Sequence, residues 1–249
     1  MNKICARHKY ISRVKGTLMC SYYIFMCFSV ESSLKTTSIS LLAIVYLLTS
    51  KIPHFQWIGI GLIGWCGMQF AELLLWLTEP RKGCTLWNKI ITMTLIPLVL
   101  MLQPLGFLFG SLFVIPWDKS SDMRKKLLIF YTLFIVLAVS YTFYYKPSKI
   151  CTTVTESGHL YWSPSDYSYS AADIATYFLW AVLIILPIVM FWNKSYAIIV
   201  LLIIIPTFGL LTGLKTDSRA SIWCHYTSYT SMISIAILFA QQVLNIKLL

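Results

Sequence analysis

Glu72 is the residue of this sequence with the clearest potential for chemistry, because it is the only charged residue in the long apolar run 56–78. It lies six residues before the end of that run, which corresponds to about 9 Å along a helix. A carboxylate at this depth in a bilayer is costly unless it is protonated, paired or hydrated, so it marks a functional-site hypothesis by default. Gln69, Trp65 and Trp76 recur with Glu72 at helical spacing, and we expect this face to point into a helix bundle.

Further polar residues are expected at a similar depth if successive membrane spans alternate in direction. The longest loop, 146–170, would cover this half of the bilayer. We therefore expect a polar vestibule, centred on Glu72, beneath a lid formed by that loop. The ligand-binding residues of this hypothesis are Glu31, Gln69, Glu72, Asn88, Gln103, Asp173 and His225, and the lid residues are His159, Trp162 and Asp166.

This vestibule would bind a small molecule, an ion or a lipid, in a transporter, a channel or a receptor-like module. One alternative is an intramembrane enzyme acting on lipid, with Glu72 or Asp173 as general base and His225 assisting. Another is a structural or envelope protein, in which Gln69, Gln103 or His225 bonds to Glu72 and only specifies helix packing.

Several established chemistries lack their required residues. The run 222–244 contains no lysine for a retinal Schiff base. The four histidines include no pair at helical spacing, so we expect no metal site. A glycine-rich phosphate loop and a CxxC motif are also missing from the sequence. We therefore assign no catalytic residue and no cofactor.

The composition indicates a membrane protein. Of the 249 residues 58% are hydrophobic and 12% are charged, about half the charged fraction of a soluble chain. The net charge of +11 comes from scattered Lys and Arg residues, which favours anionic lipid headgroups over nucleic acid as the partner.

The elements that would position Glu72 are seven transmembrane helices in an all-α, multi-pass bundle. A span needs roughly 20 apolar residues, because the hydrocarbon layer is about 30 Å thick. Residues 1–26 would form a basic tail and an interfacial lead-in, although a cleaved signal peptide over 1–30 is an alternative. The predicted spans are 27–49, 56–78, 90–114, 127–145, 171–192, 196–214 and 222–244.

Two further patterns predict contacts. Glu31 and Lys35 are four residues apart and can form an ion pair near a helix end. Gly106 and Gly110 form a small-xxx-small pair, which allows close helix packing.

The sidedness of the chain receives opposing indications. The amino-terminal side would carry twelve Lys and Arg residues against seven, a weak indication of a cytoplasmic amino terminus. A disulfide between Cys84 and Cys151, which share the same side, would require an oxidising compartment and an exterior amino terminus. Reduced thiols are the interpretation that we favour from sequence, and the orientation stays open.

Short motifs also resemble a known family. They are the run Met68-Gln69-Phe70-Ala71-Glu72 with Trp76, then Cys84 and Asn88, Gln103-Pro104, Trp223-Cys224, and Cys27-Phe28 with Glu31 and Ser33. Together they resemble an uncharacterised multi-pass membrane-protein family of large DNA viruses and protists. The resemblance covers most of 27–244 and implies a helical membrane fold, but it implies no activity.

Overall fold

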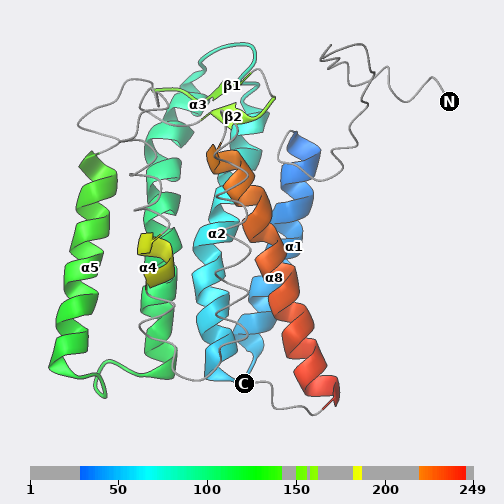
Figure 1. Ribbon diagram of the computed structural model, residues 1–249. Helices are drawn as coiled ribbons and strands as arrows, with labels where there is room; N and C mark the ends of the chain where they lie inside the picture. The colour runs from blue at the N-terminus through cyan, green and yellow to red at the C-terminus, as the bar shows by residue number, and fades with distance from the viewer. Residues whose placement is uncertain (1–28, 142–149, 156–157, 162–181, 187–218, 245–249) are drawn as a thin grey trace, which may run out of the picture.

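The computed structural model describes residues 29–141, 150–155, 158–161, 182–186 and 219–244, and most of these residues are helical (Figure 1). The elements in chain order are α1 (Val30–Thr49), α2 (Pro53–Leu77), α3 (Leu86–Ile90), the π turn η2 (Ile91–Leu95), α4 (Ile96–Val114), α5 (Asp122–Ser140), β1 (Thr153–Val154), β2 (Leu160–Tyr161) and α8 (Arg219–Leu244).

Three helices in the described residues are long and apolar enough to cross a membrane, and they correspond to the predicted spans 27–49, 56–78 and 90–114. They are Val30–Thr49, Pro53–Leu77 and the continuous helix Leu86–Val114, and α8 contains a shorter apolar stretch, Tyr229–Ala240. Helix α5, which covers most of the predicted span 127–145, is not among them, so the predicted count of seven spans is not shown. The predicted spans 171–192 and 196–214 lie outside the described residues, apart from the helical residues 182–186. The prediction of a mostly helical membrane protein is therefore confirmed at this level.

Helix starts differ from the predicted ones because capping residues set them. Ser121 accepts a hydrogen bond from the backbone N–H of Arg124, so α5 begins at Asp122 rather than at 127. Ser29 likewise accepts from the N–H of Ser32 and starts α1.

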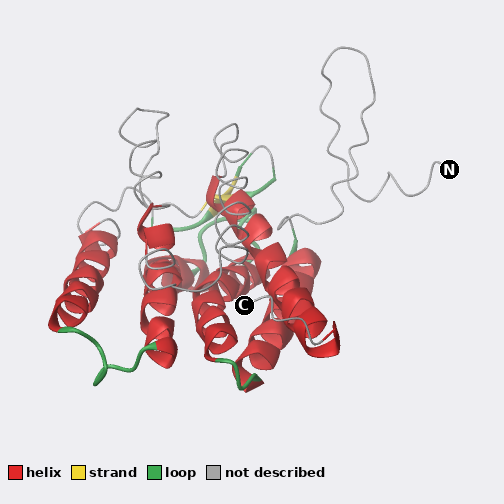
Figure 2. Cartoon of the chain, turned by 60° about the horizontal axis from the view of Figure 1, so that its bottom comes forward, coloured by secondary structure: helices red, strands yellow, loops and turns green. Residues whose placement is uncertain are grey.

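Helix α2 lies at the centre of the bundle (Figure 1). In its most apolar window 72% of the residues are buried, against 33% for α1. Helix α4 packs on one side of α2 and α1 on another, while α8 contacts both α1 and α2, and α5 packs against α4. Figure 2 shows the connections α1–α2 and α4–α5 at one end of the bundle and the short hairpin β1–β2 at the other.

Helices α2 and α4 approach each other closely at glycines, as the Gly106–Gly110 spacing predicted. A Cβ atom on Gly106 would lie 2.9 Å from the carbonyl oxygen of Ile60, and one on Gly110 would lie 2.8 Å from Trp57. The closest approach to a main-chain atom is at Gly64, where a Cβ would lie 2.4 Å from the carbonyl oxygen of Leu102. The two backbones therefore touch without side chains between them.

The π turn η2 interrupts the helix that contains α3 and α4. The N–H of Ile96 donates to the carbonyl of Ile91, five residues earlier. Pro97 follows directly and has no N–H of its own, so the helix loses a donor at this point. This wider turn was not predicted from the sequence.

At the opposite end of the bundle, Arg124 is buried and holds the end of α4. Its guanidinium donates to the carbonyls of Ser111 and Ile115, each at 3.2 Å, and to the hydroxyl of Ser120. The Ser111 carbonyl also accepts the N–H of Ile115 at 3.0 Å, so Arg124 adds a second donor there, and it supplies a donor to the Ile115 carbonyl just after the last turn of α4.

Candidate functional site

Glu72 is completely buried on α2, on the same face as Gln69. The Thr36 hydroxyl of α1 donates to Gln69 Oε1 at 3.0 Å, which places these two residues side by side. Helices α1 and α2 are antiparallel. Three residues from Thr36 and three residues from Gln69 towards the hairpin end are therefore Ser33 and Glu72, which lie at the same level. The Cys66 thiol, at 3.8 Å from the carbonyl of Thr37, is consistent with this register.

In the first half of α1, every buried residue carries a hydroxyl group. Ser33, Thr37 and Ser40 are the only buried residues between 30 and 40. Among the elements that the structure describes, α1 packs substantially only against α2 and α8, and these hydroxyl groups lie on its buried side.

Helix α8 presents hydroxyl groups in return. Its buried polar residues are Thr230, Ser231 and Ser234. The Tyr46 hydroxyl of α1 donates to Gln242 Oε1 at 2.7 Å, and the two helices run in the same direction. Thirteen residues before this pair lie Ser33 on α1 and Tyr229 on α8, so Thr230 lies close to the level of Ser33 and Glu72.

Four of these hydroxyl oxygens make no hydrogen bond within the described part of the chain. They are the side-chain oxygens of Ser33, Thr37, Ser40 and Thr230. Buried hydroxyl groups in a helix usually bond to the carbonyl four residues earlier, as Ser234 does to Thr230 at 2.8 Å. We call Glu72, Ser33, Thr37 and Thr230 the Glu72 cluster. Sequence reasoning missed its three hydroxyl residues, although the spacing of 33, 37 and 40 was a usable signal.

Gln103 does not belong to the Glu72 cluster. It lies beside Gly64, where its backbone nitrogen would be 2.6 Å from an added Cβ. Gly64 is eight residues from Glu72 along α2, or about 12 Å, so the expected pairing of Gln103 with Glu72 is not formed. The Gln103 side chain is nevertheless buried, and its Oε1 bonds to no other described residue.

Asn88 has a structural role that the vestibule hypothesis did not foresee. Its amide nitrogen donates to the carbonyl of Thr152 at 2.9 Å, and its Oδ1 accepts from the N–H of Thr152 at 2.8 Å. The Thr92 hydroxyl is 3.1 Å from Asn88 Oδ1 and 2.8 Å from the Thr152 hydroxyl. Asn88 therefore joins the start of α3 to the segment that enters β1.

A disulfide between Cys84 and Cys151, with Cα atoms 5.7 Å apart, reinforces this junction. The reduced thiols favoured from sequence are thus not what the structure contains. The hairpin pairs Thr153 with Tyr161 and Val154 with Leu160, and Gly158 takes the positive φ of 88° that its turn requires. His159, expected to face a ligand from a lid, is buried in this turn, where its backbone bonds to Thr155. The hairpin is therefore a fixed cap at its disulfide end and not a free lid.

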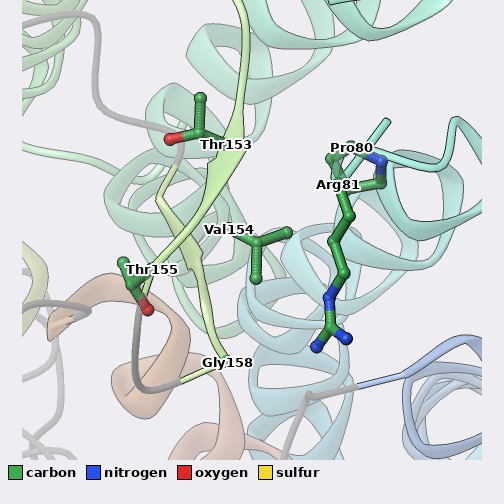
Figure 3. A pocket seen from close by; sticks show the side chains of 6 residues that line it. All are labelled: Pro80, Arg81, Thr153, Val154, Thr155 and Gly158. Carbon is green, nitrogen blue, oxygen red and sulfur yellow. The ribbon is translucent and has the colours of Figure 1, made fainter. Parts of the chain in front are cut away.

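An open hollow of about 350 Å³ lies between the hairpin and the end of α2 (Figure 3). It is lined by Pro80, Arg81, Thr153, Val154, Thr155 and Gly158. Arg81 extends along it, and its guanidinium carbon is 5.9 Å from the centre of the Trp76 ring. None of the lining residues belongs to the Glu72 cluster, whose acid is enclosed rather than open to a vestibule.

The remaining predicted site residues divide into two groups. Glu31 is exposed and forms a 2.7 Å ion pair with Lys35, so it contributes to the surface of α1 and not to the site. The side chains of Trp162, Asp166, Asp173 and His225 lie outside the described residues. Within the described ranges, His, Cys, Asp and Glu side chains form no group of three that could hold a metal ion.

No protein-family model, no curated protein and no solved structure matches this chain.

Proposed function

We propose that this chain is an integral membrane protein of seven spans that carries a small ligand across the bilayer, with Glu72 as the ligand-binding acid. The full burial of Glu72 on α2, the most buried of the three long apolar helices described, is the observation that supports this proposal. Ionisable residues at such positions are rare and commonly lie on substrate or ion pathways. The spans 171–192 and 196–214, together with His225 and Asp173, complete the proposed bundle.

A transport role is favoured over a lipid-modifying enzyme by the surroundings of Glu72. Its described neighbours at the same level are hydroxyl groups, and hydrolysis of a lipid would also need a base and an activated nucleophile or metal. The structural alternative draws support from the Thr36–Gln69 hydrogen bond, which joins α1 to α2 as a packing network would.

The Cys84–Cys151 disulfide supports an orientation in which the hairpin end of the bundle faces an oxidising compartment. The amino-terminal end of α1 would then lie on that side. Membrane-impermeant maleimide should label these cysteines in intact cells only after reduction, and labelling from the cytoplasmic side would reverse the orientation.

The transport proposal is tested with purified protein in sealed lipid vesicles. Gradients of small cations, anions and neutral solutes are imposed in turn, and their decay is followed for wild type, Glu72→Gln and Glu31→Gln. Glu72→Gln keeps the shape and removes the charge, while Glu31→Gln makes the same change at an exposed position. We expect wild type and Glu31→Gln to dissipate one of these gradients and folded Glu72→Gln to leave it intact. Equal decay in wild type and Glu72→Gln would refute the role of Glu72.

A further inference from the structure

We propose that the Glu72 cluster binds a dehydrated sodium ion between α1, α2 and α8, an inference that rests on the proposed function and specifies its ligand. The cluster contributes one carboxylate and three hydroxyl groups, from Glu72, Ser33, Thr37 and Thr230. Each of these side chains is at most 3% exposed.

The chemistry of these groups selects a hard cation. All the side-chain donors are oxygen atoms, and oxygen ligands suit alkali and alkaline-earth cations rather than soft transition metals. Three of the hydroxyl oxygens make no hydrogen bond within the described residues, so their lone pairs face the interior of the bundle. A cation among them would receive lone pairs that otherwise stay unused, and a buried polar group without a partner is destabilising.

Charge balance selects a monovalent ion. The nearest charged residues on α1, Glu31 and Lys35, are exposed and paired with each other. On α3, Lys89 is exposed as well. Glu72 is the one buried acid among the described residues, so the oxygens of the cluster carry at most one negative charge. A divalent ion would leave a net charge inside the bundle, which is strongly unfavourable at low dielectric constant.

The enclosure of the site selects a small ligand. Glu72 and Ser33 are 0% exposed, and Thr37 and Thr230 are 3% and 1% exposed, so a bound organic molecule would have to separate the helices. A sodium ion stripped of its water shell replaces that shell with protein oxygens and needs no such separation. Potassium, which is larger, should fit less well.

The π turn η2 packs against α2 from the side of α4, at the level of Glu72. Gly64 of α2 lies opposite Leu102 of α4. Eight residues from each of them towards the hairpin end lie Glu72 and Thr94, which are therefore at about the same level. Thr94 belongs to η2, which also contacts α2. Single π turns occur frequently at functional sites, and interrupted helices are used to place carbonyl oxygens around sodium. The π turn therefore lies at the level of Glu72 but across α2 from the hydroxyl groups of the cluster.

The test measures equilibrium binding of radioactive sodium to the full chain in detergent micelles, with choline replacing sodium to keep the ionic strength constant. Glu72→Gln, Ser33→Ala and Thr37→Val remove one oxygen ligand or the charge with little change of shape. Glu31→Gln and Thr132→Ala are matched controls, because Glu31 is exposed and Thr132 bonds only to the Leu128 carbonyl of its own helix α5.

We expect wild type and both controls to bind sodium with one saturable site, and to bind potassium more weakly. Glu72→Gln should abolish binding, and Ser33→Ala and Thr37→Val should each weaken it about tenfold, which corresponds to about 1.4 kcal/mol. The inference is overturned if wild type binds no more sodium than a choline blank, or if Glu72→Gln binds sodium as wild type does.

A second measurement on the wild type alone covers the case in which the variants do not fold. Sodium, but not choline, should raise the unfolding temperature with a concentration dependence that matches the binding curve. An unfolding temperature that does not respond to sodium would contradict the site. If sodium fails to bind while vesicles still lose another gradient through Glu72, the sodium inference falls and the proposed transport function stands. If sodium binds but no gradient decays, the proposed transport function falls and the sodium site stands.

Discussion

Gly64→Ala offers the sharpest test of the packing that surrounds the site. The added methyl group would lie 2.4 Å from the carbonyl oxygen of Leu102, 2.5 Å from its carbonyl carbon and 2.6 Å from the nitrogen of Gln103. All three atoms are backbone atoms, so no side-chain rotation can relieve the overlap, and α2 and α4 must move apart.

The magnitude follows from two opposing effects. Replacing a mid-helix glycine by alanine favours the helix by about 0.5–1 kcal/mol. Overpacking a well-packed interior costs typically about 1–3 kcal/mol, and displacement of a whole helix belongs to the upper part of that range. We therefore expect Gly64→Ala to lower the free energy of unfolding by about 1–2 kcal/mol.

Gly67→Ala is the matched control on the same helix. Its methyl group would meet only the Val99 side chain, at 3.3 and 3.4 Å, and a small shift of that side chain accommodates it. The helix-propensity gain should then prevail, and Gly67→Ala should equal or exceed the wild type in stability.

Both variants are compared with wild type by unfolding in mixed micelles of a mild detergent and dodecyl sulfate, followed by tryptophan fluorescence. Trp57 and Trp65 are suitable reporters, because both are buried and pack against Phe107 of α4. A Gly64→Ala variant as stable as Gly67→Ala would show that the two backbones are not in contact at Leu102, and the register built on that contact would be wrong.

Two further predictions concern the ends of the bundle. Asn88→Leu removes both hydrogen bonds to the Thr152 backbone. At about 1 kcal/mol for each bond plus the cost of the unpaired groups, we expect the free energy of unfolding to fall by about 2–4 kcal/mol. The measurements are detergent unfolding and protease cleavage near the hairpin, and unchanged cleavage would argue against the junction. Arg124→Met removes the guanidinium donors to the carbonyls of Ser111 and Ile115, although the Ile115 N–H still bonds to the Ser111 carbonyl, so we expect a loss of about 2–3 kcal/mol in the same unfolding assay. Lys126→Met, at an exposed position of the same helix, should change stability by less than about 0.5 kcal/mol.

The sequence was sufficient to predict the long apolar helices and the close contact at Gly106 and Gly110. These features depend on local composition and spacing, because the bilayer thickness sets the length of an apolar helix and small residues allow helices to pack closely. The burial of Glu72 and Gln69 also followed from their place on one helical face.

The partners of these residues could not be predicted, because partnership depends on the register between helices. Gln103 and Glu72 both lie on inward-facing stripes, yet the Gly64–Leu102 contact separates them by about 12 Å. Asn88 was read as a ligand residue because it is polar and near a span, but its partner Thr152 is sixty-four residues away in sequence. Serine and threonine were the least informative signals, since either is common in membrane helices for packing alone.

The contrast between the two sides of α2 has a mechanical consequence. Towards α4, backbone meets backbone at several glycines, and any sliding would force main-chain atoms into one another. Towards α1 and α8, the first half of the contact consists of short hydroxyl side chains, which interlock little and resist translation weakly. Relative movement within the bundle should therefore occur where α2 contacts α1 and α8, while α2 and α4 move together as one body. Glu72 lies at this contact, so its neighbours on α1 and α8 can change while the α2–α4 pair and the disulfide-linked hairpin keep their positions.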